Sequence, residues 1–174
     1  MKRTLFNTLM GCLAALSLAG CGGSGSSGGS STMPSESLIS EGYSSVHLQA
    51  SSGKYSYYYV LNSDGTCLFY PHYAKAYTFK GSWTAEFLGA GESPESGKFN
   101  ITFGAFSPAA GSLELKCTID HTSEITLTID DMIAYRAATA PVDASFDKAP
   151  YTHQAGAGCP DTSSVGTGLN LQMH

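Results

Sequence analysis

Residues 77–87 decide the fold class, because they read YTFKGSWTAEF, an unbroken alternation of two kinds of side chain. Aromatic and small residues occupy every second position from Tyr77 to Phe87, and Thr, Lys, Ser and Glu stand between them. Successive side chains of a β-strand point to opposite faces of the sheet, so the pattern predicts a strand with one buried and one solvent-facing side. The sheet that contains it has to close on itself or pack against a second layer.

The same alternation recurs on both sides of this strand, and clusters of Gly, Asn, Asp, Ser and Pro separate the repeats. No stretch between residues 45 and 136 has the period of a helix. We predict strands at residues 45–50, 54–61, 66–70, 77–87, 98–103, 113–119, 125–129 and from 131 or 132 to 137. Such a series predicts an all-β fold, an antiparallel meander of about eight strands. A small up-and-down barrel is favoured, and a β-sandwich is the alternative.

The N-terminus carries an export signal. Lys2 and Arg3 precede an apolar run from Leu9 to Ala19, which is too short to span a bilayer and has the length of a signal peptide. The run ends in Leu18-Ala19-Gly20-Cys21, which resembles the lipobox of bacterial lipoproteins. The resemblance implies that residues 1–20 are a signal peptide, that cleavage precedes Cys21, and that this cysteine carries palmitate and other acyl chains.

The lipobox also implies a location. A lipidated Cys21 would anchor the chain in a bacterial cell envelope, with the membrane as its first partner. Gly22 stands where an aspartate is associated with retention at the inner membrane of Gram-negative cells. The outer membrane is therefore the expected destination.

Composition divides the rest of the chain. Residues 21–35 are rich in Gly and Ser and predict a flexible tether behind the lipidated cysteine. We expect the β-barrel domain to occupy residues 36–140. Prolines and clusters of small residues interrupt any period after that point, so 141–174 is predicted to be an irregular C-terminal tail. Phe146, Tyr151 and Leu169 are the residues that could attach parts of it to the barrel.

A second resemblance concerns the body of the chain. Residues 57–70 predict a strand, a turn and a second strand, and Gly81-Ser82-Trp83 follows. This order resembles the lipocalin-like bacterial lipoproteins. Lipocalins carry a Gly-x-Trp element and an arginine near the end of the barrel that packs on the tryptophan, and Gly81, Trp83 and Arg136 match by residue type. The resemblance implies an internal pocket for a small apolar molecule.

Three cysteines remain after Cys12 leaves with the signal peptide and Cys21 takes lipid. In an oxidising envelope, one disulfide and one free thiol are expected, or pairing with another molecule. Alternation places Cys67 and Cys117 on apolar strand faces, which slightly favours pairing them. A bond from Cys159 in the tail to either of the others is the alternative.

Composition and motifs exclude several functions. A formal net charge of −5 offers no basic surface for nucleic acid. No motif places a nucleophile beside a base, so we expect a non-catalytic protein without a cofactor. The histidines show no HxxxH or HExxH spacing, and no CxxC occurs, so no metal site is predicted. They are His47, His72, His121, His153 and His174.

Aromatic residues gather between Tyr43 and Phe106. Tyr55, Tyr57 and Tyr59 share one face of a predicted strand and Tyr58 lies on the other, so with Trp83 they form a possible binding face. Exposed, this face would bind a glycan or assemble envelope proteins, whereas buried rings would only pack the barrel. A hollow interior would favour the first hypothesis, a barrel that binds a small apolar ligand.

Overall fold

The computed structural model describes residues 36–52, 55–71, 77–112, 118–153 and 169–174. All of the described residues belong to one compact unit, Thr32–His174. The predicted signal peptide, Cys21 and the predicted tether lie outside the described residues, as do Cys117 and Cys159. Among the described helices, none has the length and apolarity that crossing a membrane requires.

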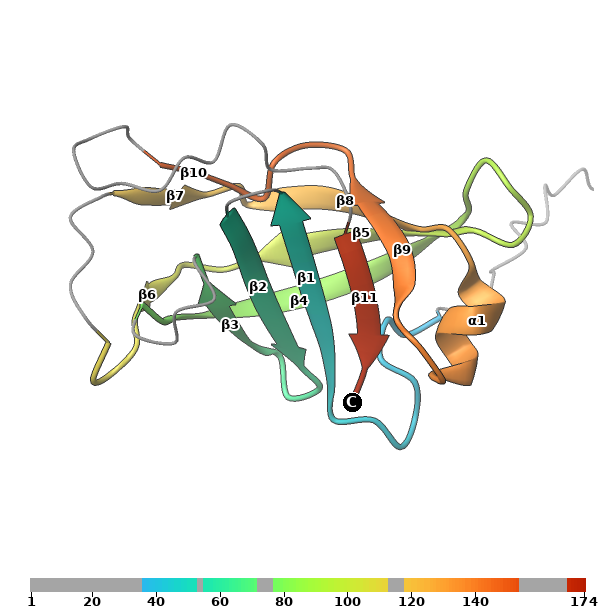
Figure 1. The fold of residues 1–174 in the computed structure, drawn as a ribbon, viewed down its shortest axis with the longest axis horizontal. Coiled ribbons are helices and arrows are strands. Elements are labelled where there is room, and N and C mark those ends of the chain that lie inside the picture. Colours follow the sequence, from blue (N-terminus) through green and yellow to red (C-terminus); the bar gives the residue numbers. More distant parts are fainter. Residues whose placement is uncertain (1–35, 53–54, 72–76, 113–117, 154–168) are drawn as a thin grey trace, which may run out of the picture. The chain divides into compact units, whose positions relative to one another are not determined.

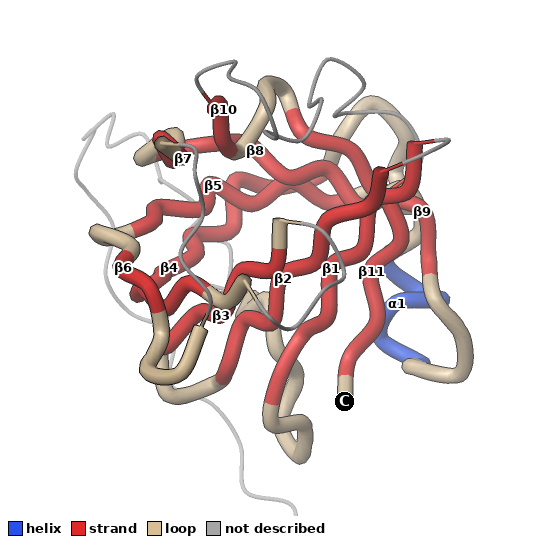
Figure 2. Tube along the Cα trace, turned by 60° about the vertical axis from the view of Figure 1, so that its left-hand side comes forward, coloured by secondary structure: helices blue, strands red, loops and turns tan. Residues whose placement is uncertain are grey.

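Eight antiparallel strands close into a barrel (Figures 1 and 2). Neighbours follow the order β1-β2-β3-β4-β5-β8-β9-β11, and β11 returns to pair with β1. The strands are β1 (Ser45–Ser52), β2 (Tyr55–Asn62), β3 (Thr66–Tyr70), β4 (Phe79–Ala90), β5 (Gly97–Phe103), β8 (Glu124–Ile129), β9 (Val142–Phe146) and β11 (Leu169–Met173). The predicted all-β, up-and-down barrel is confirmed, and the closed ring of pairings excludes the β-sandwich.

Three short strands lie outside the ring. β6 (Ser107–Pro108) pairs with the start of β4. β7 (Ile119–His121) and β10 (Tyr151–His153) form a separate two-stranded ladder, in which Tyr151 faces His121. Of the predicted strand at 113–119, residues 113–117 lie outside the described part of the chain.

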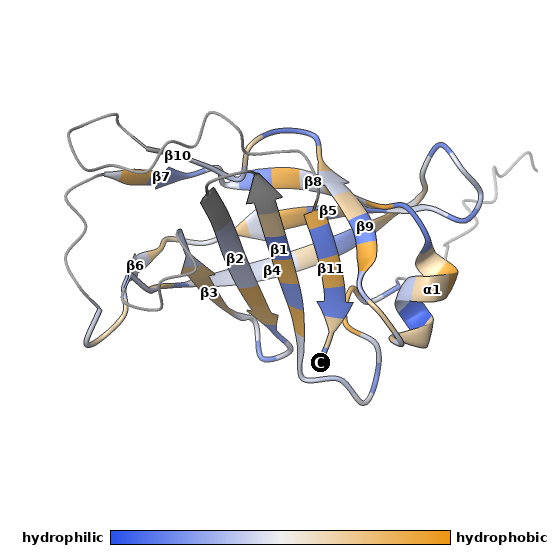
Figure 3. Ribbon diagram, in the orientation of Figure 1, coloured by the Kyte–Doolittle hydropathy of each residue, from blue (hydrophilic) through white to orange (hydrophobic). Residues whose placement is uncertain are grey.

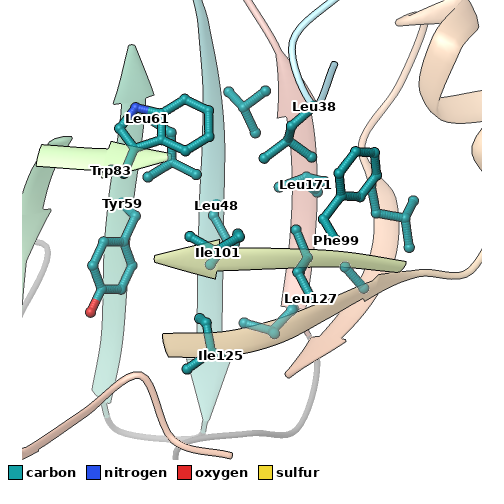
Figure 4. Packing of buried hydrophobic residues seen from close by; sticks show 14 of the residues in the cluster. Leu38, Leu48, Tyr59, Leu61, Trp83, Phe99, Ile101, Ile125, Leu127 and Leu171 are labelled. Atoms are coloured by element: carbon teal, nitrogen blue, oxygen red, sulfur yellow. The ribbon is translucent and has the colours of Figure 1, made fainter. Parts of the chain in front are cut away.

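The core follows from the predicted alternation. Hydrophobic and hydrophilic residues alternate along the strands (Figure 3), and the hydrophobic ones point into the barrel. Aliphatic side chains from opposite walls meet in the middle (Figure 4). They include Leu48, Leu61, Ile101, Ile125, Leu127 and Leu171, each at most 1% exposed.

One end of the barrel is covered by the segment that precedes β1 and by the helix α1 (Met132–Ala137). Leu38 is buried there, and the Tyr135 hydroxyl donates to the Leu38 carbonyl oxygen at 2.8 Å. The Arg136 guanidinium donates to the Ser37 carbonyl oxygen at 2.7 Å and lies 5.5 Å from the centre of the Tyr135 ring. Arg136 thus holds the N-terminal segment, whereas the lipocalin resemblance implied packing on Trp83.

Two sequence-based expectations about this region are wrong. Residues 132–137 form α1 rather than a strand, because the Asp131 side chain caps the helix by accepting from the Ala134 backbone N–H at 2.8 Å. Residues 141–174 are not only a tail, since they supply β9 and β11 to the barrel. The barrel domain therefore extends well beyond residue 140, and β11 is the strand that closes it.

Candidate ligand-binding site

Aromatic rings fill the part of the barrel next to the β7–β10 ladder. We call this group the aromatic chamber. Its rings come from six strands and from the loop after β5, and each lies within 6.5 Å of another ring of the group, centre to centre. The members are Tyr57, Tyr59, Phe69, Phe79, Phe103, Phe106, His121 and Tyr151.

His121 occupies the centre of this chamber. Its ring stacks on Phe106 at 3.7 Å and meets Phe69 edge-on at 4.8 Å, measured between ring centres. Burial among these rings lowers the pKa of His121 to about 4, because the charged imidazolium would lose its hydration. The ring is therefore neutral at pH 7. The Tyr59 hydroxyl lies 3.5 Å from its Nδ1.

Two buried polar atoms in the chamber lack a hydrogen-bond partner within the described part of the chain. They are the Tyr57 hydroxyl oxygen and His121 Nε2. Leaving such a group unpaired costs about 1–3 kcal/mol, so natural proteins rarely do it without a reason. Burial also raises the pKa of Tyr57, which keeps its hydroxyl protonated and able to donate. The chamber thus offers two unused hydrogen-bonding groups in apolar surroundings.

A hollow of about 290 Å³ lies against His121. Its walls are the loop that follows β5 and the strand β7, and the lining residues are Phe103, Gly104, Ala105, Phe106, Ile119, Asp120, His121 and Ser123. The volume is close to the lower limit of ligand pockets, about 300 Å³. Gly81 makes room beside it, since a Cβ at that position would lie 2.8 Å from the Phe106 ring.

The predicted tyrosine-rich binding face does not exist as an exposed surface. Tyr57, Tyr59 and Trp83 are only 3%, 1% and 8% exposed. Tyr58 lies on the outer face, as alternation predicted, and nothing is described of the Tyr55 side chain. Trp83 also lies apart from Tyr55. Its indole N–H donates to the carbonyl oxygen of Asn62 at 2.9 Å, and Asn62 and Tyr55 are the opposite ends of β2.

The described cysteine is not cross-linked. Cys67 is a free thiol with no exposed surface, inside the barrel beside the other core residues. Burial raises the pKa of this thiol, so it stays protonated and unreactive. Its predicted partners, Cys117 and Cys159, lie outside the described residues, so the disulfide pairing stays a prediction.

Two central residues of the chamber, His121 and Tyr151, were not predicted as site residues. Tyr151 lies in the region predicted as a tail. The β7–β10 ladder brings them to the chamber, and their ring centres are 6.2 Å apart. The sequence feature that could have indicated a buried position in this region was Tyr151, an aromatic residue alone among small and polar neighbours.

Comparison with family models, curated proteins and solved structures gives no match for this chain, so its candidate function rests on the geometry of the barrel.

Proposed function

We propose that this protein is a non-catalytic, lipid-anchored lipoprotein of the cell envelope whose barrel binds a small apolar ligand in the aromatic chamber. The observation that carries the proposal is a pair of buried groups with no hydrogen-bond partner among the described residues, the Tyr57 hydroxyl and His121 Nε2. They lie in a chamber that adjoins a hollow through His121. A ligand that reached both would relieve the cost of leaving them unpaired.

The chamber walls indicate the chemistry of the ligand. Its rings are apolar or neutral, and each Å² of apolar ligand surface buried there would contribute about 25 cal/mol. A charged group among these rings would lose its hydration without gaining an opposite charge, because the Asp120 carboxylate that lines the hollow is exposed to solvent and is not one of the rings. The ligand therefore has an apolar body and one or two uncharged polar atoms.

The polar atoms of the ligand are expected to be acceptors. If the Tyr59 hydroxyl donates to His121 Nδ1, the neutral imidazole carries its proton on Nε2 and donates from there. The Tyr57 hydroxyl is a second donor. A carbonyl or ether oxygen satisfies both without bringing a charge into the chamber.

The lipobox supports the remaining part of the proposal. Lipidation of Cys21 would hold the barrel at the outer membrane through the Gly-Ser-rich tether. The second hypothesis, an exposed tyrosine face for envelope partners, loses its support because Tyr57, Tyr59 and Trp83 are buried.

Titration with N-phenyl-1-naphthylamine, a neutral apolar fluorophore, tests the ligand site. All barrel strands lie between residues 45 and 173, so the chain from residue 22 onward serves as the sample. We expect saturable binding that Ala105→Trp weakens at least about tenfold, because the indole would occupy the hollow.

Ala90→Trp is the matched control, since Ala90 is also exposed but lies at the end of β4 and does not line the hollow. It should bind the fluorophore like the unaltered chain. Equal binding by all three proteins would place the fluorophore elsewhere, and the absence of saturable binding would refute the proposal.

A further inference from the structure

Two histidines that are far apart in sequence meet on the outer surface of the barrel. His47 on β1 faces Gln172 on β11. His174 faces Ser45, and the two exchange backbone hydrogen bonds of 2.8 and 3.1 Å. The histidines are therefore diagonal neighbours on one face of the sheet. Their rings stack at 3.8 Å between centres, with an angle of 26° between the planes.

A tyrosine orients the first of these rings. The Tyr58 hydroxyl is hydrogen-bonded to His47 Nδ1, and the Tyr58 ring meets the imidazole edge-on at 5.4 Å. A metal-bound histidine usually makes such a bond through its second nitrogen, which fixes the ring and leaves the other nitrogen for the metal. With Nδ1 engaged, Nε2 of His47 is the nitrogen available to a ligand.

A shallow hollow of about 210 Å³ surrounds the pair. Within the described part of the chain, the side chains that line it carry two imidazoles, three amides and one phenol, and none of them carries a carboxylate, ammonium or guanidinium group. The lining residues are His47, Gln49, Tyr58, Pro141, Asn170, Gln172 and His174. Imidazoles suit Cu²⁺ and Zn²⁺, whereas Ca²⁺ and Mg²⁺ prefer carboxylate oxygens.

We propose that His47 and His174 form a surface site for a divalent transition-metal ion, Cu²⁺ in preference to Zn²⁺. In the stack the in-plane lone pairs of the two imidazoles run side by side, so the exposed His174 ring would turn out of the stack to share one ion with His47. A nearby amide oxygen or water would complete the coordination. No three His, Cys, Asp or Glu side chains gather within the described residues. The site is therefore open, with positions left for an exogenous ligand, and it binds Cu²⁺ more tightly than Zn²⁺.

The site lies outside the barrel and is independent of the proposed ligand chamber.

Calorimetry and electron paramagnetic resonance with Cu²⁺ alone test the proposal on the full mature chain in detergent. We expect one Cu²⁺ per chain with two nitrogen atoms in its equatorial plane. His47→Gln and His174→Gln should each weaken binding at least about tenfold, because each removes one of two imidazoles. Gln172→His should strengthen it by a similar factor, since it places a third imidazole opposite His47.

His153→Gln is the matched control, because His153 lies in the β7–β10 ladder. It should bind Cu²⁺ like the unaltered chain. A loss of affinity in only one of the two site variants, or an equal loss in His153→Gln, would overturn the paired site. So would a signal from a single nitrogen atom in the unaltered chain.

Discussion

His121 brings an ionisable ring into aromatic surroundings that cannot solvate its charge. Stacking on Phe106 and edge contact with Phe69 keep water away from the ring, and the lowered pKa follows from that. A phenylalanine would pack there without any electrostatic cost. The imidazole is therefore best explained by the hydrogen bond that its Nε2 can offer to a ligand.

The lowered pKa of His121 predicts how stability changes with pH. Its folded value of about 4 lies below the ordinary 6.5, so between these values the unfolded chain binds a proton that the folded chain excludes. The free energy of unfolding is therefore unaffected by protonation of His121 above pH 6.5, and it decreases as the pH falls from 6.5 to 4. One pH unit corresponds to about 1.4 kcal/mol, which gives a loss of up to about 3 kcal/mol.

Urea unfolding at several pH values, comparing the unaltered chain with His121→Phe, measures this term. Carboxylates and His47 titrate in both proteins, so the difference between the two curves isolates His121. The unaltered chain should lose more stability than the variant as the pH falls from 6.5 to 4. Parallel curves over that range would contradict the assignment of the lowered pKa to burial of His121.

At single residues, the sequence predicted which side chains share a face of a strand but not which face points into the barrel. Alternation correctly separated Tyr57 and Tyr59 from Tyr58, because a strand has a period of two. It did not identify the inner face, since tyrosine suits both a core and a surface. The pairing of His47 with His174 has no local signal at all, because it depends on the register between β1 and β11.

At the level of elements, the prediction was best where strands are consecutive in the chain. β1 to β5 follow one another as neighbours, and each has apolar residues on its inner face. β9 also has apolar residues there, Val142, Ala144 and Phe146, but it lies between Pro141 and Pro150, and β11 is separated from it by more than twenty residues. α1 has six residues, too few to display a helical period, and Asp131 at its N-cap was the available signal.

The role of β11 predicts the effect of shortening one of its side chains. Leu171 has no exposed surface and packs between the walls of the barrel (Figure 4). Leu171→Ala should lower the free energy of unfolding by about 2–5 kcal/mol, because it leaves a cavity in the core. Urea unfolding followed by circular dichroism measures the change.

Asn170→Ala is the control on the same strand, since this side chain is exposed on the outer face. It should change the free energy of unfolding by less than about 0.5 kcal/mol. If Leu171→Ala changed the free energy of unfolding as little as Asn170→Ala, β11 would not close the barrel. The prediction of an irregular tail at 141–174 would then be supported.

For the whole molecule, the two ends of the barrel differ in a way that suits a binding protein. Leu38, Tyr135 and Arg136 join the N-terminal segment to α1 over one end, with hydrogen bonds that fix it. The aromatic chamber lies away from this cover, holds two polar atoms with no partner among the described residues, and adjoins a hollow at His121. A ligand would enter through the hollow while the cover at the other end stays in place.

The net charge of the chain determines whether electrostatic attraction would help to hold the barrel at a membrane. If residues 1–20 are removed as a signal peptide, Lys2 and Arg3 are lost and the formal charge changes from −5 to −7. Bacterial membrane surfaces are themselves anionic, so a chain of that charge would have no electrostatic attraction to them. Several acyl chains, at about 0.8 kcal/mol for each buried CH₂ group, would have to supply all of the attachment.

Cys21→Ala should therefore abolish palmitate labelling and remove the protein from the outer-membrane fraction. Cys12→Ala is the matched control, because Cys12 lies inside the predicted signal peptide, and this variant should be labelled and fractionate normally. Labelling with radioactive palmitate and membrane fractionation give the two readouts. Labelling that persists in Cys21→Ala would show that another residue carries the lipid. Unchanged fractionation without label would show that the protein associates with the membrane without the lipid.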